Sequence, residues 1–577
     1  MRSSFPDRLR PRRGAALFVV TIVIVLVSLT AYSFVILMQA ENRAAHMSAD
    51  RMQVQAVGDS AGEYLKTLLA MPRIDRDLVG GWFDNPNQFQ DVVVDRDYFG
   101  QRHGRFCVLA SKYDEENPDE YFFFGVECTS AKISLPTLLQ WDEIEPGSGR
   151  LALMRLPGMT ETVADSILDW IDPDDQPREF GAELEFYSGL NPPRAPINQV
   201  PAHLEMLLAV RGVSRMRLLD GSQPTLGPDR KTNATDEGSG SLNSNGLPSN
   251  DLPIDTSNPN DRSASSSQRL SVTNDSTLDA RPWSHFLTVY SAERNEAYDG
   301  FPRIHLNQEN LVSLHEQLSS RFSEELANFV LLMRQSGPAE ERTDARSADQ
   351  LPTISLTESA GYEFLSPLDV VDAFVIVGEG ESDESQDDEP VFKSPISTDG
   401  NSEISVIEFC DATTTREDPI IVGRVDLNRA TAEVLAAIPE FPPEAVEQVV
   451  ATRDDATSLT PERRHASWLL AEGIVELETM RLLLPFLTVG GDVIQGEVVA
   501  YYDADSPWSR HEFVLDGTPE EITTLFYRDL RRSGRGYRYD ELALVDDPDQ
   551  PLGGPPAKAT DSRASALPQS SPSQQRP

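Results

Sequence analysis

The feature that most constrains this chain of 577 residues is an apolar run near its N-terminus that extends to Met38. Five arginines precede the run, the last two being Arg12 and Arg13. The only serine and threonine residues within it are Thr21, Ser28, Thr30 and Ser33. About two dozen helical residues at about 1.5 Å each span about 36 Å, which is enough to cross a bilayer. Because flanking basic residues stay in the cytoplasm, we expect a single-pass protein with its N-terminus cytoplasmic and its bulk on the outer side.

The start of the apolar run, at Gly14-Ala15, allows two interpretations. Secretory signals end their apolar core with a small-x-small site, and Met38-Gln39-Ala40-Glu41 matches one poorly. One interpretation is therefore an uncleaved signal anchor in which the glycine occurs by chance. The layout also resembles the leader of type IV pilins and type II secretion pseudopilins, in which a prepilin peptidase cuts after the glycine. This second interpretation predicts a leader over 1–14 and cleavage between Gly14 and Ala15.

Helical periodicity continues beyond the apolar run as far as Ala70, and Met71-Pro72 ends it. We therefore expect one helix over 15–70, half of it in the membrane and half packed on a folded domain. Its apolar stripe consists of Ala44, Ala45, Met47, Met52, Val54, Val57, Ala61, Tyr64, Leu65, Leu68 and Leu69. A small antiparallel sheet is predicted over 71–130, with a hairpin formed by 105–110 and 121–126.

An internal repeat dominates the rest of the chain, and the predicted fold class is therefore α+β. The segments 132–135, 303–307 and 424–428 share one alternating signature that leads into pairs of helices, and a partial fourth copy lies near 197–216. Polar, Pro-rich or acidic segments between the repeats predict solvated linkers. The predicted parts are a helical inserted domain with helix-hairpin-helix-like units (131–220), a disordered linker (221–282), a second helical or mixed unit (283–377), an acidic linker (378–400), a third helical unit with C-terminal strands (401–545) and a disordered tail (546–577).

The charge balance of the chain limits which partners it can bind. The chain has 93 acidic and 50 basic residues, a formal net charge of −43, and such a polyanion gains nothing from neutralising phosphates. Leu156-Pro157-Gly158-Met159 resembles the hairpin of a helix-hairpin-helix module, which in DNA-binding members holds a phosphate. At Ile438-Pro439-Glu440-Phe441, however, a carboxylate replaces the glycine. We therefore expect no nucleic-acid partner and interpret the modules as packing units.

Hard oxygen ligands are concentrated after the predicted helix that ends near Trp170. Asp172, Asp174, Asp175, Glu179 and Glu183 follow it within a short stretch. Ca²⁺ takes six to eight such oxygens from a flexible loop. The spacing is not that of an EF-hand, because Pro177 stands where the loop glycine is needed. A calcium site formed by these five residues and a solvated acidic turn are both compatible with the sequence.

The three cysteines and the catalytic motifs limit the chemistry. Cys107 and Cys128 fall on neighbouring predicted strands, so a disulfide between them and a pair of free buried thiols are both open. The sequence contains no GxxxxGK[ST], no HExxH and no GxSxG motif. We therefore expect a protein that is not an enzyme.

In combination, these segments resemble the minor pseudopilin K (GspK) family of type II secretion systems. The resemblance is good over about 10–220 and patchier over 283–530, and it depends on the order of the motifs. The matching segments are Arg13-Gly14-Ala15-Ala16-Leu17, 56–69, Asp169-Trp170-Ile171-Asp172-Pro173-Asp174-Asp175 with Gly181-Ala182-Glu183, Val210-Arg211-Gly212-Val213, and 425–433. Family members join a pilin helix and a small sheet to an inserted helical domain and are thought to cap the pseudopilus.

The resemblance implies a minor pseudopilin of the inner membrane with a periplasmic body. It would nucleate assembly with other minor pseudopilins and the major pseudopilin, after processing by prepilin peptidase. In most pilins the fifth mature residue is a glutamate that pairs with the terminal amine of a neighbouring subunit. Counted from Ala15, that position is Val19 here, as suits a subunit with no neighbour above it. The alternative is a membrane-tethered DNA-uptake protein built on helix-hairpin-helix modules.

Overall fold

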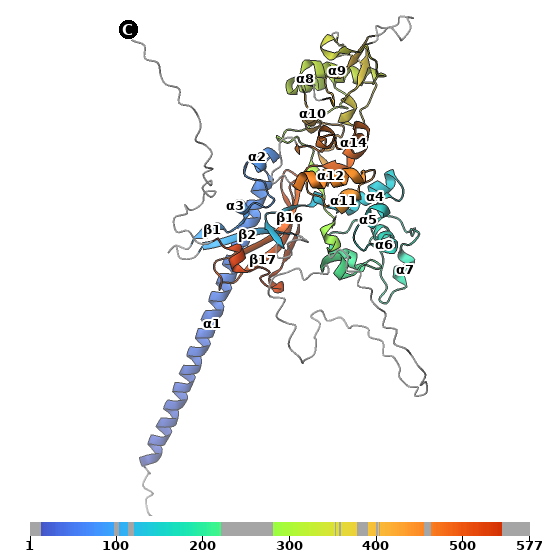
Figure 1. Cartoon of the computed structure of the whole chain (residues 1–577). Helices are drawn as coiled ribbons and strands as arrows, with labels where there is room; N and C mark the ends of the chain where they lie inside the picture. Colours follow the sequence, from blue (N-terminus) through green and yellow to red (C-terminus); the bar gives the residue numbers. More distant parts are fainter. Residues whose placement is uncertain are drawn as a thin grey trace, which may run out of the picture.

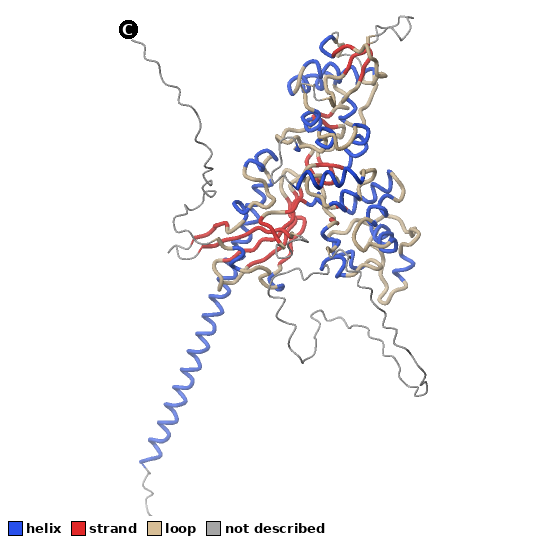
Figure 2. The backbone as a smooth tube through the Cα atoms, in the orientation of Figure 1, coloured by secondary structure: helices blue, strands red, loops and turns tan. Residues whose placement is uncertain are grey.

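The computed structural model describes residues 13–96, 103–112, 121–220, 281–351, 354–356, 359–377, 390–399, 402, 404–454 and 463–544. The predicted leader up to residue 12 lies outside the described residues, as do the linker over 221–280, the acidic run 378–389 and the tail from 545. Within the described residues the fold is α+β, as the sequence predicts, with one long helix, one seven-stranded sheet and a large helical region (Figures 1 and 2).

The long helix is α1 (Arg13–Leu69), and it confirms the prediction of one continuous helix over 15–70. Its apolar first part extends away from the rest of the molecule (Figure 1), and the side chains from Leu17 to Met38 are all exposed. In the part of the chain that the structure describes, this is the one helix long and apolar enough to span a membrane. Length and composition therefore identify the first part of α1 as a single candidate membrane anchor.

The second part of α1 packs on the sheet, but later along the helix than the sequence indicates. The predicted stripe begins at Ala44, whereas Met47 and Met52 are 52% and 65% exposed. Burial begins at Val54 and continues every third or fourth residue through Val57, Ala61, Leu65 and Leu69. Except for the half-buried Asp50, the side chains of the segment 39–53 are exposed. This segment separates the folded body from the apolar segment by several turns.

The sheet under α1 is antiparallel, with the strand order β1-β2-β16-β17-β18, while β3 pairs with β2 and β4 with β16. Its strands are β1 (Val92–Arg96), β2 (His103–Ser111), β3 (Phe122–Phe124), β4 (Glu127–Cys128), β16 (Val493–Tyr501), β17 (Ser509–Asp516) and β18 (Thr523–Asp529). The pairing of β2 with β3 confirms the predicted hairpin. The predicted division is wrong in one respect: the sheet placed within 71–130 and the strands assigned to 401–545 are one sheet, with the helical region inserted between β4 and β16.

The two faces of the sheet have separate covers. Phe106, Val498 and Phe513 face the buried stripe of α1, while Leu109 and Tyr501 pack against the C-terminal segment that carries Tyr537 and Leu542. Alternating residues of β16 supply both layers, as the period of two in a strand requires. Short helices complete this part: α2 (Arg73–Leu78), α3 (Pro86–Phe89) and α15 (Tyr539–Leu542).

The helical region consists of three units, each closed by a two-residue parallel strand pair. β5 (Ile133–Ser134) pairs with β6 (Leu287–Thr288), β8 (Ile304–His305) with β12 (Thr413–Thr414), and β14 (Val425–Asp426) with β15 (Leu487–Thr488). The first strand of each pair lies in one of the three repeated signatures. The predicted repeat is therefore confirmed as a structural unit, whose chain enters and leaves side by side. β7 (Ala292–Arg294) and β13 (Ile420–Val422) pair between the units.

The helices of the three units share one core. The first unit contains α4 (Leu135–Ile144), α5 (Ser148–Met154), α6 (Glu161–Ile171) and α7 (Leu184–Ser188). The second unit contains α8 (Leu311–Arg321), α9 (Glu324–Ser336), β9 (Arg346–Ser347), β10 (Phe374–Ile376), β11 (Val391–Lys393) and α10 (Val406–Ala412). The third unit contains α11 (Ala432–Ala436), α12 (Pro443–Asp454), α13 (Trp468–Ala471) and α14 (Leu477–Leu483). In Figure 1 the second unit lies at the opposite end from the free part of α1, the third unit lies between it and the sheet, and the first unit lies beside the sheet.

Three further boundaries differ from the sequence prediction. Residues 391–393 pair with β10 and belong to the second unit, so the acidic linker does not extend to residue 400. That unit ends with β12 rather than at 377. The partial fourth repeat forms no strand. It forms a 3₁₀ helix at Leu204–Ala209 and a π-helical turn at Met216–Asp220, both within the first unit.

Candidate metal centre

The predicted cation ligands lie around the end of α6. Thr160 caps this helix, its side chain accepting a hydrogen bond from the Val163 amide, and Pro173 follows its last turn. α6 is buried on nearly every side, which includes the side that carries Asp165 and Asp169. These two carboxylates share a face because they are four residues apart. A buried helix therefore places ionised groups inside the protein, where each needs a partner.

Arginines supply some of the partners that these buried carboxylates need. Arg150 donates from Nε and Nη2 to the two carboxylate oxygens of Asp165, at 2.6 and 2.7 Å. Arg178 donates from its backbone and from Nη1 to Asp169, and also to Asp172. Its Nη2 lies 3.3 Å from a carboxylate oxygen of Asp142. One guanidinium thus serves three carboxylates, and the pair formed by Arg150 and Asp165 is complete by itself.

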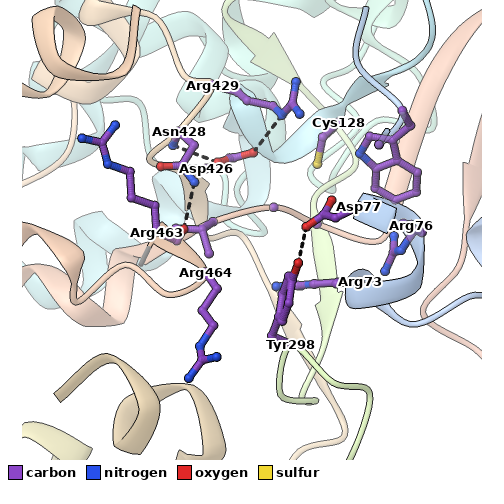
Figure 3. A pocket seen from close by; sticks show the side chains of 15 residues that line it. Arg73, Arg76, Asp77, Cys128, Tyr298, Asp426, Asn428, Arg429, Arg463 and Arg464 are labelled. Atoms are coloured by element: carbon purple, nitrogen blue, oxygen red, sulfur yellow. Dashed lines mark hydrogen bonds and ion pairs between the residues drawn. The ribbon is translucent and has the colours of Figure 1, made fainter. Parts of the chain in front are cut away.

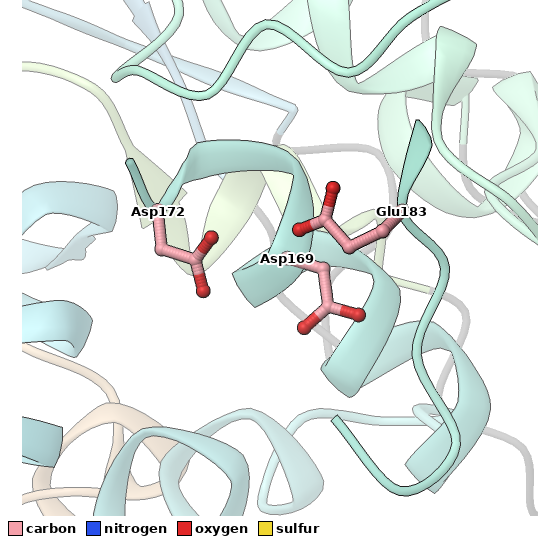
Figure 4. A group of neighbouring side chains, drawn as sticks. All are labelled: Asp169, Asp172 and Glu183. Atoms are coloured by element: carbon pink, nitrogen blue, oxygen red, sulfur yellow. The ribbon is translucent and has the colours of Figure 1, made fainter. Parts of the chain in front are cut away.

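Glu183 brings a further carboxylate to this place without a compensating donor. One ligand oxygen from each of Asp169, Asp172 and Glu183 falls within 4.8 Å of the others, and all three residues are buried (Figure 4). Both oxygens of Glu183 and Oδ1 of Asp172 have no hydrogen-bond partner among the described residues. Unpaired buried acceptors of this kind cost several kcal/mol each in general, so they indicate a missing cation or proton.

The pKa values report the same imbalance. Burial raises the pKa of Glu183 to about 7, and the neighbouring charges of Asp169 and Asp172 add to the effect. Burial also raises the pKa of Asp169 and of Asp172, although the hydrogen bonds from Arg178 oppose the shift. The cluster therefore holds more negative charge than its surroundings compensate. A divalent cation with oxygen preference fits this donor set.

The structure brings together only part of the predicted ligand set. Asp172 and Glu183 belong to the cluster. Asp174 accepts from the Gln176 amide, Asp175 accepts from Asn198, and Glu179 is exposed, so these three lie outside it. Those positions in the prediction are therefore wrong, because turn-forming acids after a helix bind their own loop rather than converge.

The sequence prediction missed Asp169. The signal was present, since Asp165 and Asp169 interrupt the apolar face of a helix at a spacing of four, and only partnered acids persist there. Gly181 completes the arrangement. A Cβ at Gly181 would lie 1.8 Å from Oδ2 of Asp169, so the chain passes the carboxylate only because this residue has no side chain.

The cluster has access to solvent through an open groove of about 520 Å³. Asp172 and Arg178 line it together with Leu139, Asp142, Glu143, Pro146, Gly147, Arg150, Pro173 and Asp174.

Of the two states left open for Cys107 and Cys128, the structure has the pair of free buried thiols. They lie opposite Val499 and Ile494 on the same edge of β16, five positions apart along that strand, or roughly 16 Å at about 3.3 Å per residue. A disulfide needs Cα atoms within about 7 Å. Burial raises the pKa of both thiols to about 12, so neither is a nucleophile at neutral pH.

The hairpins of the helix-hairpin-helix-like units face other parts of the same chain. Gly158 and Glu440 both have a left-handed backbone, with φ of 64° and 59°. The Pro157 carbonyl accepts a hydrogen bond from Nε1 of Trp283 at 2.9 Å, and the Arg217 guanidinium lies against Gly158. The first hairpin is thus covered from within, which agrees with the interpretation of the modules as packing units.

A comparison with protein families found a match within the first helical unit. Residues 150–219, which include α6, the acidic cluster and two of the hairpins, match the family model described as type II secretion system (T2SS), protein K. Over these residues the chain is similar to protein K of type II secretion systems, and the match supports a GspK-like pseudopilin. No curated protein matches the chain. Proteins of this family are structural components of the type II secretion system, and membership implies interaction with other pseudopilins of that system.

Proposed function

We propose that this pseudopilin occupies the tip of the pseudopilus and nucleates its assembly with other minor pseudopilins. The observation that carries the proposal is the arrangement of α1, the sheet and the inserted units. A helix with an exposed apolar first part packs on the sheet, and the protein K region interrupts that sheet between β4 and β16. The second unit lies at the end opposite the free part of α1, with the third unit between it and the sheet, and the first unit lies beside the sheet (Figure 1). A bulky body there suits a subunit with nothing stacked above it.

Orientation and processing belong to the same proposal. The exposed apolar side chains from Leu17 to Met38 are suited to the inner membrane, with the sheet and helical units in the periplasm. Prepilin peptidase would cut between Gly14 and Ala15, within the first turns of α1. Mass spectrometry of the mature protein is then expected to find Ala15 at the N-terminus, and an intact Met1 would contradict processing.

Position five of the mature chain provides the sharpest test of the tip position. Val19 is 57% exposed on α1, as an assembly residue must be before it meets its partners. A Val19→Glu variant would place a carboxylate in the apolar filament core with no terminal amine above it, at a cost of several kcal/mol. We expect the variant to co-purify with much less of its partner pseudopilins from detergent extracts.

Val19→Leu is the matched control, because it changes shape without adding charge, and it should assemble normally. If Val19→Glu co-purifies as well as the wild type, a subunit above supplies the amine and the tip position is wrong. Loss of partners in both variants would instead indicate a steric role of this position anywhere in the filament.

We further propose that Asp169, Asp172 and Glu183 hold a Ca²⁺ ion that stabilises the first helical unit. Glu183 offers two unpartnered oxygens and Asp172 one, which is the start of a hard-oxygen site. A ligand that binds only the folded state at about 100 times its dissociation constant stabilises that state by about 2.7 kcal/mol. Chelator should therefore lower the thermal midpoint of the full-length protein in detergent, and added Ca²⁺ should restore it.

Asp172→Asn is expected to abolish this response to Ca²⁺. Asp174→Asn is the control, since Asp174 is exposed, lies two residues away and belongs to no cluster. An equal response to Mg²⁺ would change the identity of the ion. No response to either ion would refute the site while leaving the tip proposal intact.

A further inference from the structure

A buried histidine lies in the contact between α1 and the sheet. His511 is on β17, two residues before Phe513, and alternation along the strand turns both side chains toward α1. The residue is 4% exposed. A Cβ at Gly58 of α1 would lie 2.8 Å from Cε1 of His511, so the imidazole approaches the helix backbone where glycine leaves room for it.

No hydrogen bond satisfies the side of this ring that faces the helix. Nδ1 of His511 is buried and has no hydrogen-bond partner among the described residues. It would lie 3.5 Å from the same Cβ position at Gly58, so it belongs to the edge of the ring that faces α1. By contrast, the half-buried Asp77, just beyond the end of α1, accepts a hydrogen bond from Tyr298 at 2.6 Å (Figure 3). A neutral imidazole tolerates its position because one of its two nitrogens carries no proton.

Charged and titratable groups surround His511 on every element that packs against it. They are Asp59 of α1, Glu497 of β16, Tyr527 and Asp529 of β18, and Arg531 after β18. Asp529 lies opposite His511 in the strand register, but Arg531 already donates to its carboxylate. Glu497 is likewise bound by Arg510. Burial lowers the pKa of His511, and the three carboxylates oppose this shift without cancelling it.

We infer that His511 makes the packing of α1 on the sheet sensitive to mild acid. An imidazolium carries a proton on both nitrogens, so its Nδ1 becomes a donor that faces Gly58, where the described residues offer no acceptor. A buried charged donor without an acceptor destabilises the folded contact. The penalty disappears when α1 moves off the sheet and water reaches the ring. Acid therefore favours local detachment of α1 around Gly58.

The sign of the pH dependence follows from the lowered pKa. Neutral His511 stabilises the contact fully above its ordinary pKa of 6.5, and this contribution is lost as the pH falls through the lower pKa of the folded protein. Glu183 acts in the opposite direction, because its pKa is raised. The effect of His511 must therefore be measured locally, at α1, rather than from the stability of the whole chain.

Hydrogen exchange of the full-length protein in detergent provides this local measurement. The protection factors of the α1 amides from Val54 to Leu65 should fall between about pH 7.5 and about pH 5.5, by up to about tenfold for each unit by which the pKa is lowered. Helix α9 of the second unit is the internal reference and should keep its protection. An equal fall in α1 and α9 would overturn the inference, because the whole protein would then respond to acid.

Variants assign the response to the ring. His511→Gln keeps a polar side chain but takes up no proton, so the protection of α1 should be the same at both pH values. His46→Gln is the matched control, since His46 is exposed on α1 before the contact begins, and it should respond as the wild type does. If His511→Gln loses as much protection at α1 as the wild type, another group titrates and the inference is wrong.

A second variant tests the same inference without altering the core, should His511→Gln fail to fold. Asp59 is exposed on α1, and its charge favours the imidazolium. Asp59→Asn should therefore move the loss of α1 protection to lower pH. A loss at the same pH as in the wild type would mean that the titrating group does not lie beside Asp59, and would contradict the assignment to His511.

Discussion

Two clusters of buried charge in this molecule have opposite compositions. In the acidic cluster, Asp169 and Asp172 share one guanidinium, that of Arg178, and both carboxylate oxygens of Glu183 lack a hydrogen-bond partner among the described residues. At the junction of the sheet with the helical units, Glu293 and Asp492 lie among several arginines. All five of these carboxylates are buried. Burial alone therefore does not distinguish the two clusters, whereas the ratio of guanidinium groups to carboxylates does.

The pKa shifts have opposite signs for this reason. At the acidic cluster burial outweighs the effect of Arg178, and the pKa of each carboxyl is raised. At the junction burial again raises it, but Arg73 and Arg76 outweigh burial and hold the pKa of Asp492 at about 2. Arg424 and Arg73 likewise lower the pKa of Glu293. One cluster has more carboxylates than the arginine beside it compensates, and the other has its cations built in.

The junction carboxylates connect segments that are far apart in sequence. Asp492 precedes β16, pairs with Arg76 of α2 and accepts a hydrogen bond from the Arg294 amide of β7 at 2.8 Å. Glu293 pairs with Arg73 and Arg424 and accepts from Thr488 at 2.7 Å. The entry and exit segments of the helical region are thus held together by ion pairs as well as by strands. The acidic cluster connects only α6 with the loop that follows it.

The largest effect is expected when the junction is broken. Asp492→Asn keeps the shape and the acceptor for the Arg294 amide but leaves Arg73 and Arg76 without their shared counter-charge. Removing one partner of a buried ion pair costs about 3–5 kcal/mol. We expect a corresponding fall in the stability of the full-length protein, measured by denaturant unfolding in detergent, with or without Ca²⁺.

Asp516→Asn provides the control for this substitution, because Asp516 lies on β17 and only caps the adjacent Thr518. Its effect should stay near 1 kcal/mol, the value of one ordinary hydrogen bond. If Asp492→Asn were no more destabilising than the control, the arginines would be compensated by other groups, and the contrast between the clusters would disappear.

A smaller effect, and one that a cation reverses, is expected at the acidic cluster. Arg178→Gln removes the one guanidinium that Asp169 and Asp172 share, at a cost of about 2–3 kcal/mol in the absence of metal. Ca²⁺ should recover much of this loss, since the substitution leaves every proposed ligand in place. Unfolding midpoints with Ca²⁺ and with chelator measure the difference. A loss that Ca²⁺ leaves unchanged would mean that Arg178 and the ion do not act on the same charges.

Sequence patterns predicted the elements of this molecule better than their assembly. Helical periodicity gave the extent of α1, and the repeated signatures located the first strand of each helical unit, because both are local properties of the chain. The sheet was divided wrongly because β4 and β16 are separated by more than 360 residues, and no local pattern records which strands pair across such an insertion. The same gap left the state of Cys107 and Cys128 open, since only the pairing with β16 shows that the two cysteines meet that strand at different positions.

The acidic cluster shows a similar limit. Acid content directed attention to the segment after α6 and correctly included Asp172 and Glu183. Which acids converge depends on the path of the loop past Asp169, which a glycine at 181 permits. The small pocket at the junction, which five arginines line, left no signal in the sequence, since its residues come from six separate segments, and a net charge of −43 conceals a local excess of positive charge.

The smallest effect concerns acid, and it tests the sign of the shift at the junction. The pKa of Asp492 is about 2 in the folded protein, below its ordinary value of 3.8, so ionised Asp492 stabilises the fold. This contribution is present above about pH 4 and is lost as the pH falls towards 2. A difference of nearly two pH units corresponds to about 2 kcal/mol. Between pH 4 and pH 2.5 the wild type should lose more stability than Asp492→Asn, which has no carboxyl to protonate at this position. Equal losses of stability in the two proteins would show that Arg73 and Arg76 do not hold this carboxylate in its charged form. The opposite signs of the carboxyl pKa shifts in the two clusters would then no longer follow from their arginines.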